Sequence, residues 1–225
     1  QPVLVETRPG ASGNVGAGSP NFGGTGIVTG GNASIAINTS STVAADFITV
    51  SANAVTYETS RTGNATAGTA SVTISNGTVT LDEVEVSANA FLGTEFGQNV
   101  GSINGMSAGT NTGGTANLSV AGGTLTANRA NVTSTAVGVG QQRTDVNDVT
   151  ENSAIEQALA GGGGSGGNAT FAISGGSANF AETLLVDASG RGGNGYINAD
   201  SFVTQPISAG AGGAGAGGNA SLNVT

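Results

Sequence analysis

The 225-residue chain contains no cysteine, histidine, lysine or tryptophan, and these absences exclude several classes of protein. Without cysteine the chain forms no disulfide and offers no thiolate to a metal ion. Without histidine or cysteine it cannot build the Ser-His-Asp or Cys-His arrangements of nucleophilic catalysis. The sequence therefore predicts a protein that is not an enzyme and that carries no cofactor.

Charge is scarce and mostly negative, with 14 Asp and Glu against five Arg and a net charge of −9. Nucleic acids and anionic membranes attract clustered Lys or Arg, so neither is an expected partner. The sequence has no run of 18 apolar residues, and no insertion into a membrane is expected. Calcium stays open at Asp145, Asn147 and Asp148, although this segment lacks the glycine and the terminal glutamate of a calcium-binding loop.

Carboxylate pairs can hydrolyse glycosides without histidine, and one cluster of acidic residues invites that hypothesis. Asp82, Glu83 and Glu85 lie close together, but they fall at a corner and on an outward face. The matching positions of the next repeat hold two Asn and one Arg. A solvated corner is the favoured interpretation over a polysaccharide-cleaving enzyme.

Glycine is abundant, at 41 residues, but a Gly-X-Y period is absent and proline occurs only four times, which excludes collagen. Instead a two-part pattern occurs five times. Its first part, G-[NT]-A-x-Φ-x-Φ with Φ apolar, contains Ala33, Ala70, Ala116, Ala169 and Ala220. Its second part, Φ-x-V-x-A, contains Val5, Val50, Val86, Val132 and Val186. Each alanine precedes the next valine by 16 or 17 residues, whereas the return distance varies from 20 to 37. A constant unit alternating with variable insertions is typical of a repeat array.

The clearest unit runs from Gly68 to Ala90, and its apolar residues alternate with polar ones as in β-strands. Two corners, at Asn76-Gly77 and Asp82-Glu83, divide it into three short strands. Equivalent strands recur one unit later, so each strand should pair in parallel with the equivalent strand of the next unit. We predict an all-β parallel β-solenoid, right-handed by the general crossover rule, with about five three-stranded coils and Gly-rich insertions stacked along one edge.

The predicted array is a single domain over residues 1–225. Its coil cores are residues 31–54, 68–90, 114–136 and 167–189, with partial strands at 1–8 and 218–225. Its insertions are residues 9–31, 55–68, 91–114, 137–167 and 190–218.

Stacked coils should align equivalent residues into columns along the array. The predicted core columns are Ile35, Val72, Leu118, Phe171 and Leu222, and Val50, Val86, Val132 and Val186. The predicted structural ladder of polar residues, at the corner before the first strand, is Asn32, Thr69, Thr115, Asn168 and Asn219.

The printed sequence begins within a third strand and stops just after a first strand. Two interpretations follow. Either the sequence is an excerpt of a longer array, or its two open ends are complementary and join subunits head-to-tail into filaments.

Repeated motifs resemble those of one group of proteins. Gly-Gly-Asn-Ala occurs at 30–33, 166–169 and 217–220, and Val-Ser-Ala-Asn-Ala at 50–54 and 86–90. Divided by Gly-rich spacers, these elements resemble the repeats of large secreted bacterial exoproteins, the β-strand-repeat and filamentous-haemagglutinin-like surface proteins. The resemblance implies secretion to the bacterial cell surface and a role in fibres, adhesion or biofilm matrix.

Three functional hypotheses remain. The first is a structural segment of an extracellular filament or surface fibre that self-associates head-to-tail. The second is an adhesin whose insertions bind a glycan or a host surface, for which the candidate residues are Tyr57, Phe91, Phe96, Tyr196 and Phe202. The third is an ice-binding solenoid, which needs a regular Thr-x-Thr array. Thr78 and Thr80 fit such an array, but Ser177 and Asn179 interrupt it.

Overall fold

The structure, a computed structural model of the chain, is all-β in every part that it describes. It describes residues 13–16, 28–56, 64–92, 102–103, 109–138, 140–141, 158–159, 161–193, 196–197 and 211–225. These residues include no helix, and hence none that is long and apolar enough to cross a membrane. All strand pairs but one are parallel. The prediction of an all-β, parallel architecture is confirmed.

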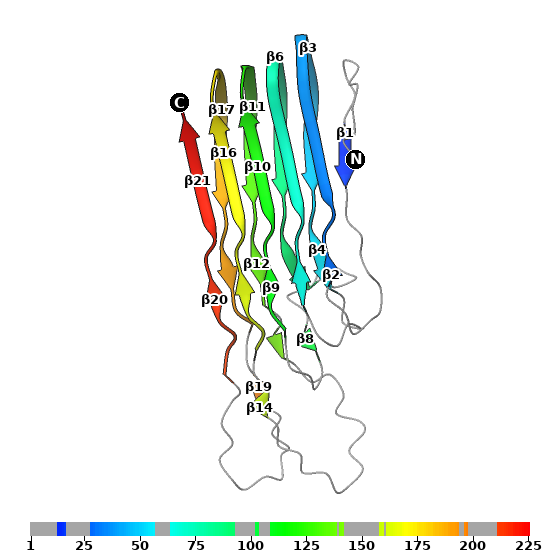
Figure 1. Ribbon diagram of the computed structural model, residues 1–225, viewed down its shortest axis with the longest axis vertical. Helices are drawn as coiled ribbons and strands as arrows, with labels where there is room; N and C mark the ends of the chain where they lie inside the picture. Colours follow the sequence, from blue (N-terminus) through cyan, green and yellow to red (C-terminus); the bar gives the residue numbers. More distant parts are fainter. Residues whose placement is uncertain are drawn as a thin grey trace, which may run out of the picture.

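The main sheet contains eight strands, which follow one another across the molecule in chain order (Figure 1). Its strands are β1 (Gly13–Gly16), β3 (Asn32–Ser51), β6 (Thr69–Ser87), β10 (Thr115–Val120), β11 (Gly123–Thr133), β16 (Asn168–Ile173), β17 (Gly176–Asp187) and β21 (Asn219–Val224). In the third and fourth repeats two strands, β10 with β11 and β16 with β17, take the place of one long strand. Neighbouring repeats thus share one continuous parallel ladder.

The register of this sheet places equivalent residues of successive repeats side by side. Ala33 pairs with Ala70, Ala70 with Ala116, and the alignment continues through Ala169 to Ala220. Because side chains alternate between the two faces of a strand, this register brings all the apolar sets to one face.

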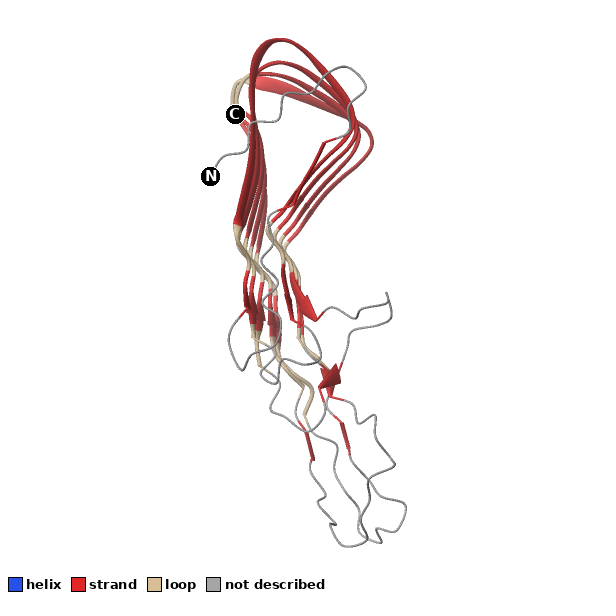
Figure 2. Ribbon diagram, turned by 90° about the vertical axis from the view of Figure 1, so that its right-hand side faces the viewer, coloured by secondary structure: helices blue, strands red, loops and turns tan. Residues whose placement is uncertain are grey.

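The predicted division of each unit into three separate strands differs from what the structure shows. β3 and β6 run without interruption through both predicted corners, and the sheet curls instead of breaking. Seen along the stack, the curled sheet forms an arch with two arms (Figure 2). Bends at Ala121–Gly122 and Ser174–Gly175 divide the later repeats. At the first corner the pairing of β3 with β6 shifts register around Asn38 and Thr42, and it resumes beyond the corner, so the two strands stay paired along both arms.

Two smaller parallel sheets continue from the two arms of the arch. The five-stranded sheet contains β2 (Val28–Thr29), β5 (Ala65–Thr66), β9 (Asn111–Thr112), β15 (Gly164–Ser165) and β20 (Gly215–Ala216). The four-stranded sheet contains β4 (Ala54–Thr56), β7 (Ala90–Leu92), β12 (Ala136–Val137) and β18 (Gly190–Arg191). Their strands contact one another between the arms. Most of these residues fall in the predicted insertions, so the stacking extends beyond the predicted coil cores.

Two further strand pairs lie beyond these sheets. β8 (Ser102–Ile103) pairs in parallel with β13 (Gly140–Gln141). β14 (Ala158–Leu159) pairs with β19 (Tyr196–Ile197), and this is the antiparallel pair.

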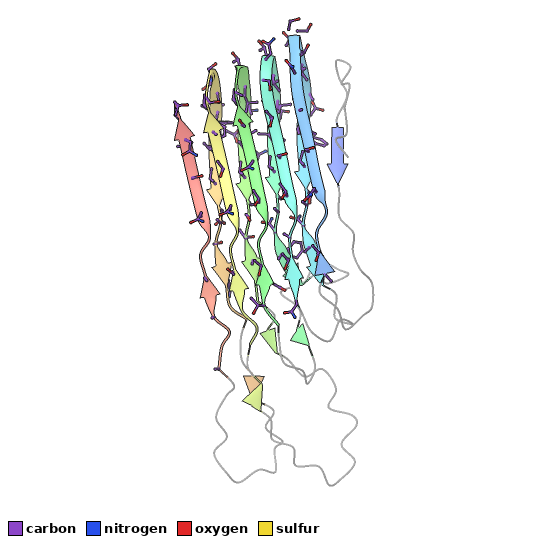
Figure 3. The ribbon with its side chains drawn as sticks, viewed as in Figure 1. Carbon is purple, nitrogen blue, oxygen red and sulfur yellow. The ribbon has the colours of Figure 1, made fainter. Side chains whose placement is uncertain are left out.

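Side chains stand along the strands of the stack (Figure 3), and the buried apolar ones of successive repeats form one cluster, which is the core. Val72 and Leu118 of the first predicted column are at most 1% exposed, as are Val50, Val86 and Val132 of the second. Phe171 packs edge-on against Phe180, with ring centroids 5.4 Å apart. No repeat encloses this core alone, because the buried residues of successive repeats form one cluster.

The strand beside Val50 is β1, in which Val15 pairs with Val50. The sequence pattern assigns that place to Val5 and the partial strand at 1–8, which lie outside the described residues. Val15 falls in the predicted first insertion. A single apolar residue between Asn14 and Gly16 shows no alternating pattern, so this strand could not be predicted.

Candidate functional site: the glycine-lined neck and the exposed edges

The two arms of the arch converge at a neck, which we define by four backbone hydrogen bonds. In each, the N–H of a glycine that precedes the first strand of a repeat donates to the carbonyl that ends the previous repeat. The donor and acceptor pairs are Gly68 with Ala52 at 2.8 Å, Gly114 with Ala88 at 2.9 Å, Gly167 with Ser134 at 2.8 Å, and Gly218 with Ala188 at 2.6 Å. The partners are 16 to 33 positions apart in the sequence. Every insertion that follows a complete repeat is therefore closed by the same contact, whatever its length.

Glycine is required in the neck by close packing. A Cβ added to Gly68, Gly114, Gly167 or Gly218 would collide with the carbonyl oxygen of the equivalent glycine in the preceding repeat. The repeated Gly-Gly dipeptides before the Asn-Ala or Thr-Ala pairs are the sequence signal of this neck. Sequence reasoning placed them in the insertions instead, because glycine runs carry no side-chain pattern.

Two buried polar side chains hold the neck together. Asn111 and Ser134 are both 0% exposed. The Ser134 hydroxyl donates to the Gly114 carbonyl at 2.7 Å, across the neck. Because these groups are removed from water, their hydrogen bonds fix the spacing and register of the two arms. Neither residue was singled out from the sequence.

A second set of amides links repeat to repeat along the stack. The Asn53 Oδ1 accepts from the Asn89 N–H at 2.7 Å, and the Asn89 Oδ1 accepts from the Thr135 N–H at 2.8 Å. The Asn of the Val-Ser-Ala-Asn-Ala motif thus satisfies a backbone donor of the next repeat.

The five residues of the predicted polar ladder are neighbours in register. Hydrogen bonds join them at both ends: the Thr69 N–H donates to Asn32 Oδ1 at 3.1 Å, and Asn219 Nδ2 donates to Asn168 Oδ1 at 3.0 Å. Beside the ladder, the glycines of the neck form the floor of a shallow groove that runs along the stack over Thr66–Thr69, Thr112–Thr115, Gly166–Asn168 and Gly217–Asn219.

The acidic corner is hydrogen-bonded to the next repeat. Asn128 Nδ2 donates to Asp82 Oδ1 at 3.2 Å, and Asn131 Nδ2 donates to Glu83 Oε1 at 2.9 Å. Within the described ranges, no three acidic residues gather where they could hold a metal ion. The calcium-loop-like segment at 145–148 lies outside those ranges.

The aromatic residues proposed for an adhesin are not brought together by the described structure. Phe91 lies in β7, and its side chain is half-buried. Tyr196 lies in β19, and Tyr57, Phe96 and Phe202 fall outside the described residues.

The two ends of the stack expose strand edges and apolar side chains. At one end β21 pairs with β16 and with no other strand among the described residues, and Leu222 and Val224 are 60% and 67% exposed. At the other end β1 covers only Ile48–Ser51 of β3, and the earlier part of β3 has no strand beside it among the described residues. Comparisons with family models, curated proteins and solved structures give no match.

Proposed function

We propose that this chain is a structural module of an extracellular bacterial filament or surface fibre, in which its repeats form a right-handed parallel β-solenoid that continues head-to-tail. The observation that carries the proposal is the in-register parallel stack, in which equivalent residues of successive repeats continue the same core columns. The surface location follows from the resemblance of the repeats to those of secreted bacterial exoproteins.

Burial along one core column shows why such a stack favours extension. Leu118, in the middle of the column, is 0% exposed, whereas Leu222 at the end of the same column is 60% exposed. A fully buried Leu contributes roughly 1.5–3 kcal/mol relative to an exposed one. Adding a further repeat therefore buries apolar surface that is now open to water.

The exposed edge lacks the features by which proteins protect edge strands from pairing. Natural edge strands carry charges, proline or a bulge. Asn219–Thr225 contains no charged residue and no proline, and β21 pairs with β16 without a register shift. An unprotected parallel edge is a template for another strand, which is what a fibre requires.

Fibre diffraction and electron microscopy of assembled material test this function. We expect long rods with a reflection at ~4.8 Å along the fibre axis, because the strands lie across that axis. A Leu118→Asp variant, in which a charge is placed in the buried column, should abolish both the rods and the reflection. Compact particles without an axial ~4.8 Å spacing would refute the proposal.

A further inference from the structure

The first corner of the second repeat folds an asparagine side chain onto the residue that follows it. The Gly77 N–H donates to the Asn76 Oδ1 at 2.9 Å. Because Cγ carries this oxygen, the carbon of the side-chain amide is held beside the Gly77 nitrogen. Asn76 is exposed, and its side chain has no other hydrogen-bond partner among the described residues. The amide is therefore open to water and in contact with its own backbone.

The corner requires glycine at position 77. Gly77 has φ of +86°, a conformation that residues with a side chain rarely adopt. A Cβ added there would also collide with the Thr39 carbonyl oxygen of the first repeat. The missing side chain leaves the Gly77 nitrogen unshielded on the side of the amide. The fold thus selects, after Asn76, the residue that least hinders a reaction at this nitrogen.

The equivalent corners of the neighbouring repeats lack this combination. Asn38 of the first repeat pairs in register with Asn76, but Thr39 follows it, and a branched side chain crowds the backbone nitrogen. The third repeat carries Gly122 and Gly123 at its corner and no asparagine. Among the described residues, Asn76 is the one asparagine that a glycine follows.

We propose that Asn76 is a site of spontaneous covalent modification, at which the chain converts its own side-chain amide into a carboxylate. The Gly77 nitrogen gives up its proton and bonds to the Asn76 Cγ. The bond between Cγ and Nδ2 breaks, and Nδ2 leaves as ammonia with that proton. The product is a five-membered succinimide ring. Both reacting atoms belong to adjacent residues that the corner already holds in contact, so little orientational entropy is lost on the way to the ring.

Water then opens the ring at one of its two carbonyl carbons. Addition at the side-chain carbonyl gives an aspartate at position 76. Addition at the main-chain carbonyl gives an isoaspartate, in which the backbone runs through the former side chain. In total one water is consumed and one ammonia is released. The reaction needs no catalyst and no oxidant, and it leaves the chain with one additional negative charge.

The corner has room for the longer backbone of isoaspartate. Asn38 pairs with Asn76 and Thr42 with Thr78, so β3 has three residues, 39–41, where β6 has Gly77 alone. The two strands nevertheless pair on both sides of the corner. One additional backbone atom is a smaller change than this difference between two repeats. The stack should therefore survive the reaction.

Peptide-resolved mass spectrometry of the full chain, aged in neutral buffer made with heavy-oxygen water, tests the proposal. Asn76 should lose its amide and take up one oxygen from water, whereas Asn38 in the same chain should keep its amide. An isoaspartate methyltransferase should label position 76. The Asn76→Gln variant should form neither product there, because its longer side chain would have to close a larger ring. The Asn-Gly dipeptides at 104–105 and 194–195 lie outside the described residues and are assigned as separate peptides.

A synthetic peptide of residues 72–81 provides the reference rate without the fold. We expect Asn76 to react in the chain at the rate that it shows in the peptide, because the corner presents the reactive contact. An Asn76 that stays intact while the peptide reacts would overturn the proposal, and so would equal losses at Asn38 and Asn76. Thermal melts of the aged chain should stay cooperative. If ageing abolished the cooperative melt of the wild type but not that of Asn76→Gln, the inference that the corner accommodates the product would be wrong.

Discussion

The side chain of Asn111 bridges the two arms of the neck, where its Nδ2 donates to the carbonyl oxygen of Val137 at 2.7 Å. Its Oδ1 accepts from the N–H of Ala65 in the preceding repeat at 3.0 Å. One fully buried amide therefore ties three segments together, across the neck and along the stack. In its column the neighbouring positions hold Ala65 and Gly164, which cannot make these contacts.

Replacing this amide by an apolar group of similar size should destabilise the fold. We expect Asn111→Leu to lower the free energy of unfolding by about 2 kcal/mol or more, because the buried N–H of Ala65 loses its acceptor. Denaturant titration measures the change. Asn38→Leu, at an exposed asparagine, is the matched control and should change the midpoint little. Equal midpoints for the two variants would contradict the role of Asn111.

Phe171 is the largest fully buried side chain among the described residues, and its removal should leave a cavity that the stack cannot close. Phe171→Ala is expected to cost about 3–5 kcal/mol of unfolding free energy. Phe47, which is 40% exposed, provides the comparison. Phe47→Ala should lower the unfolding free energy by well under half as much in the same denaturant titration. A larger loss for Phe47→Ala than for Phe171→Ala would contradict the position of the core.

The corner glycine of the third repeat should tolerate no side chain. Gly123 has φ of +80°, and an added Cβ would collide with the Gly77 carbonyl oxygen of the preceding repeat. The left-handed backbone alone costs a non-glycine residue about 1–2 kcal/mol, and the collision adds to it. Gly123→Ala should therefore lower the melting temperature, whereas Gly31→Ala should not, because no described atom lies within 4 Å of a Cβ added at Gly31. Equal melting temperatures would show that the corner relaxes freely.

The length of an insertion should matter little to stability. We expect that replacing residues 142–157 by a four-residue Gly-Ser segment changes the unfolding free energy by less than about 1 kcal/mol, because closure entropy varies slowly with loop length. The hydrogen bond between Gly167 and Ser134 closes the segment in both chains. Thermal melts followed by circular dichroism provide the measurement. A large loss of stability would mean that the replaced residues pack on the array.

The core of this molecule could be predicted because its residues alternate with a period of two. Val72, Leu118 and Phe171 each lie two positions after the equivalent alanine of their repeat. Stacking equivalent strands in register therefore places them in one column. The parallel architecture followed from the spacing of the repeats, since equivalent strands recur too far apart to pair through tight turns.

The neck could not be predicted in the same way. Its contacts are made by backbone atoms of glycines, which have no side chain to reveal which face is buried. Asn111 occupies a place where other repeats carry Val28, Ala65 or Gly164, so no column pattern marks it. The strand beside Val50 could not be predicted either. Val15 is one isolated apolar residue, whereas Val3 and Val5 alternate as expected of a strand, and the pattern therefore assigned that place to Val5.

The hydrogen bonds of the neck also give the stack a mechanical property. Tension along the stack loads the contacts between repeats, and the chain crosses from one repeat to the next only through an insertion. When the contact between Gly167 and Ser134 opens together with the strand pairs of β12, β13, β14 and β15, the 32 residues between these two positions can extend. Fully extended, they span about 110 Å at ~3.3–3.6 Å per residue. A repeat that detaches thus lengthens the chain without severing it, and the segment between the two repeats takes up the extension.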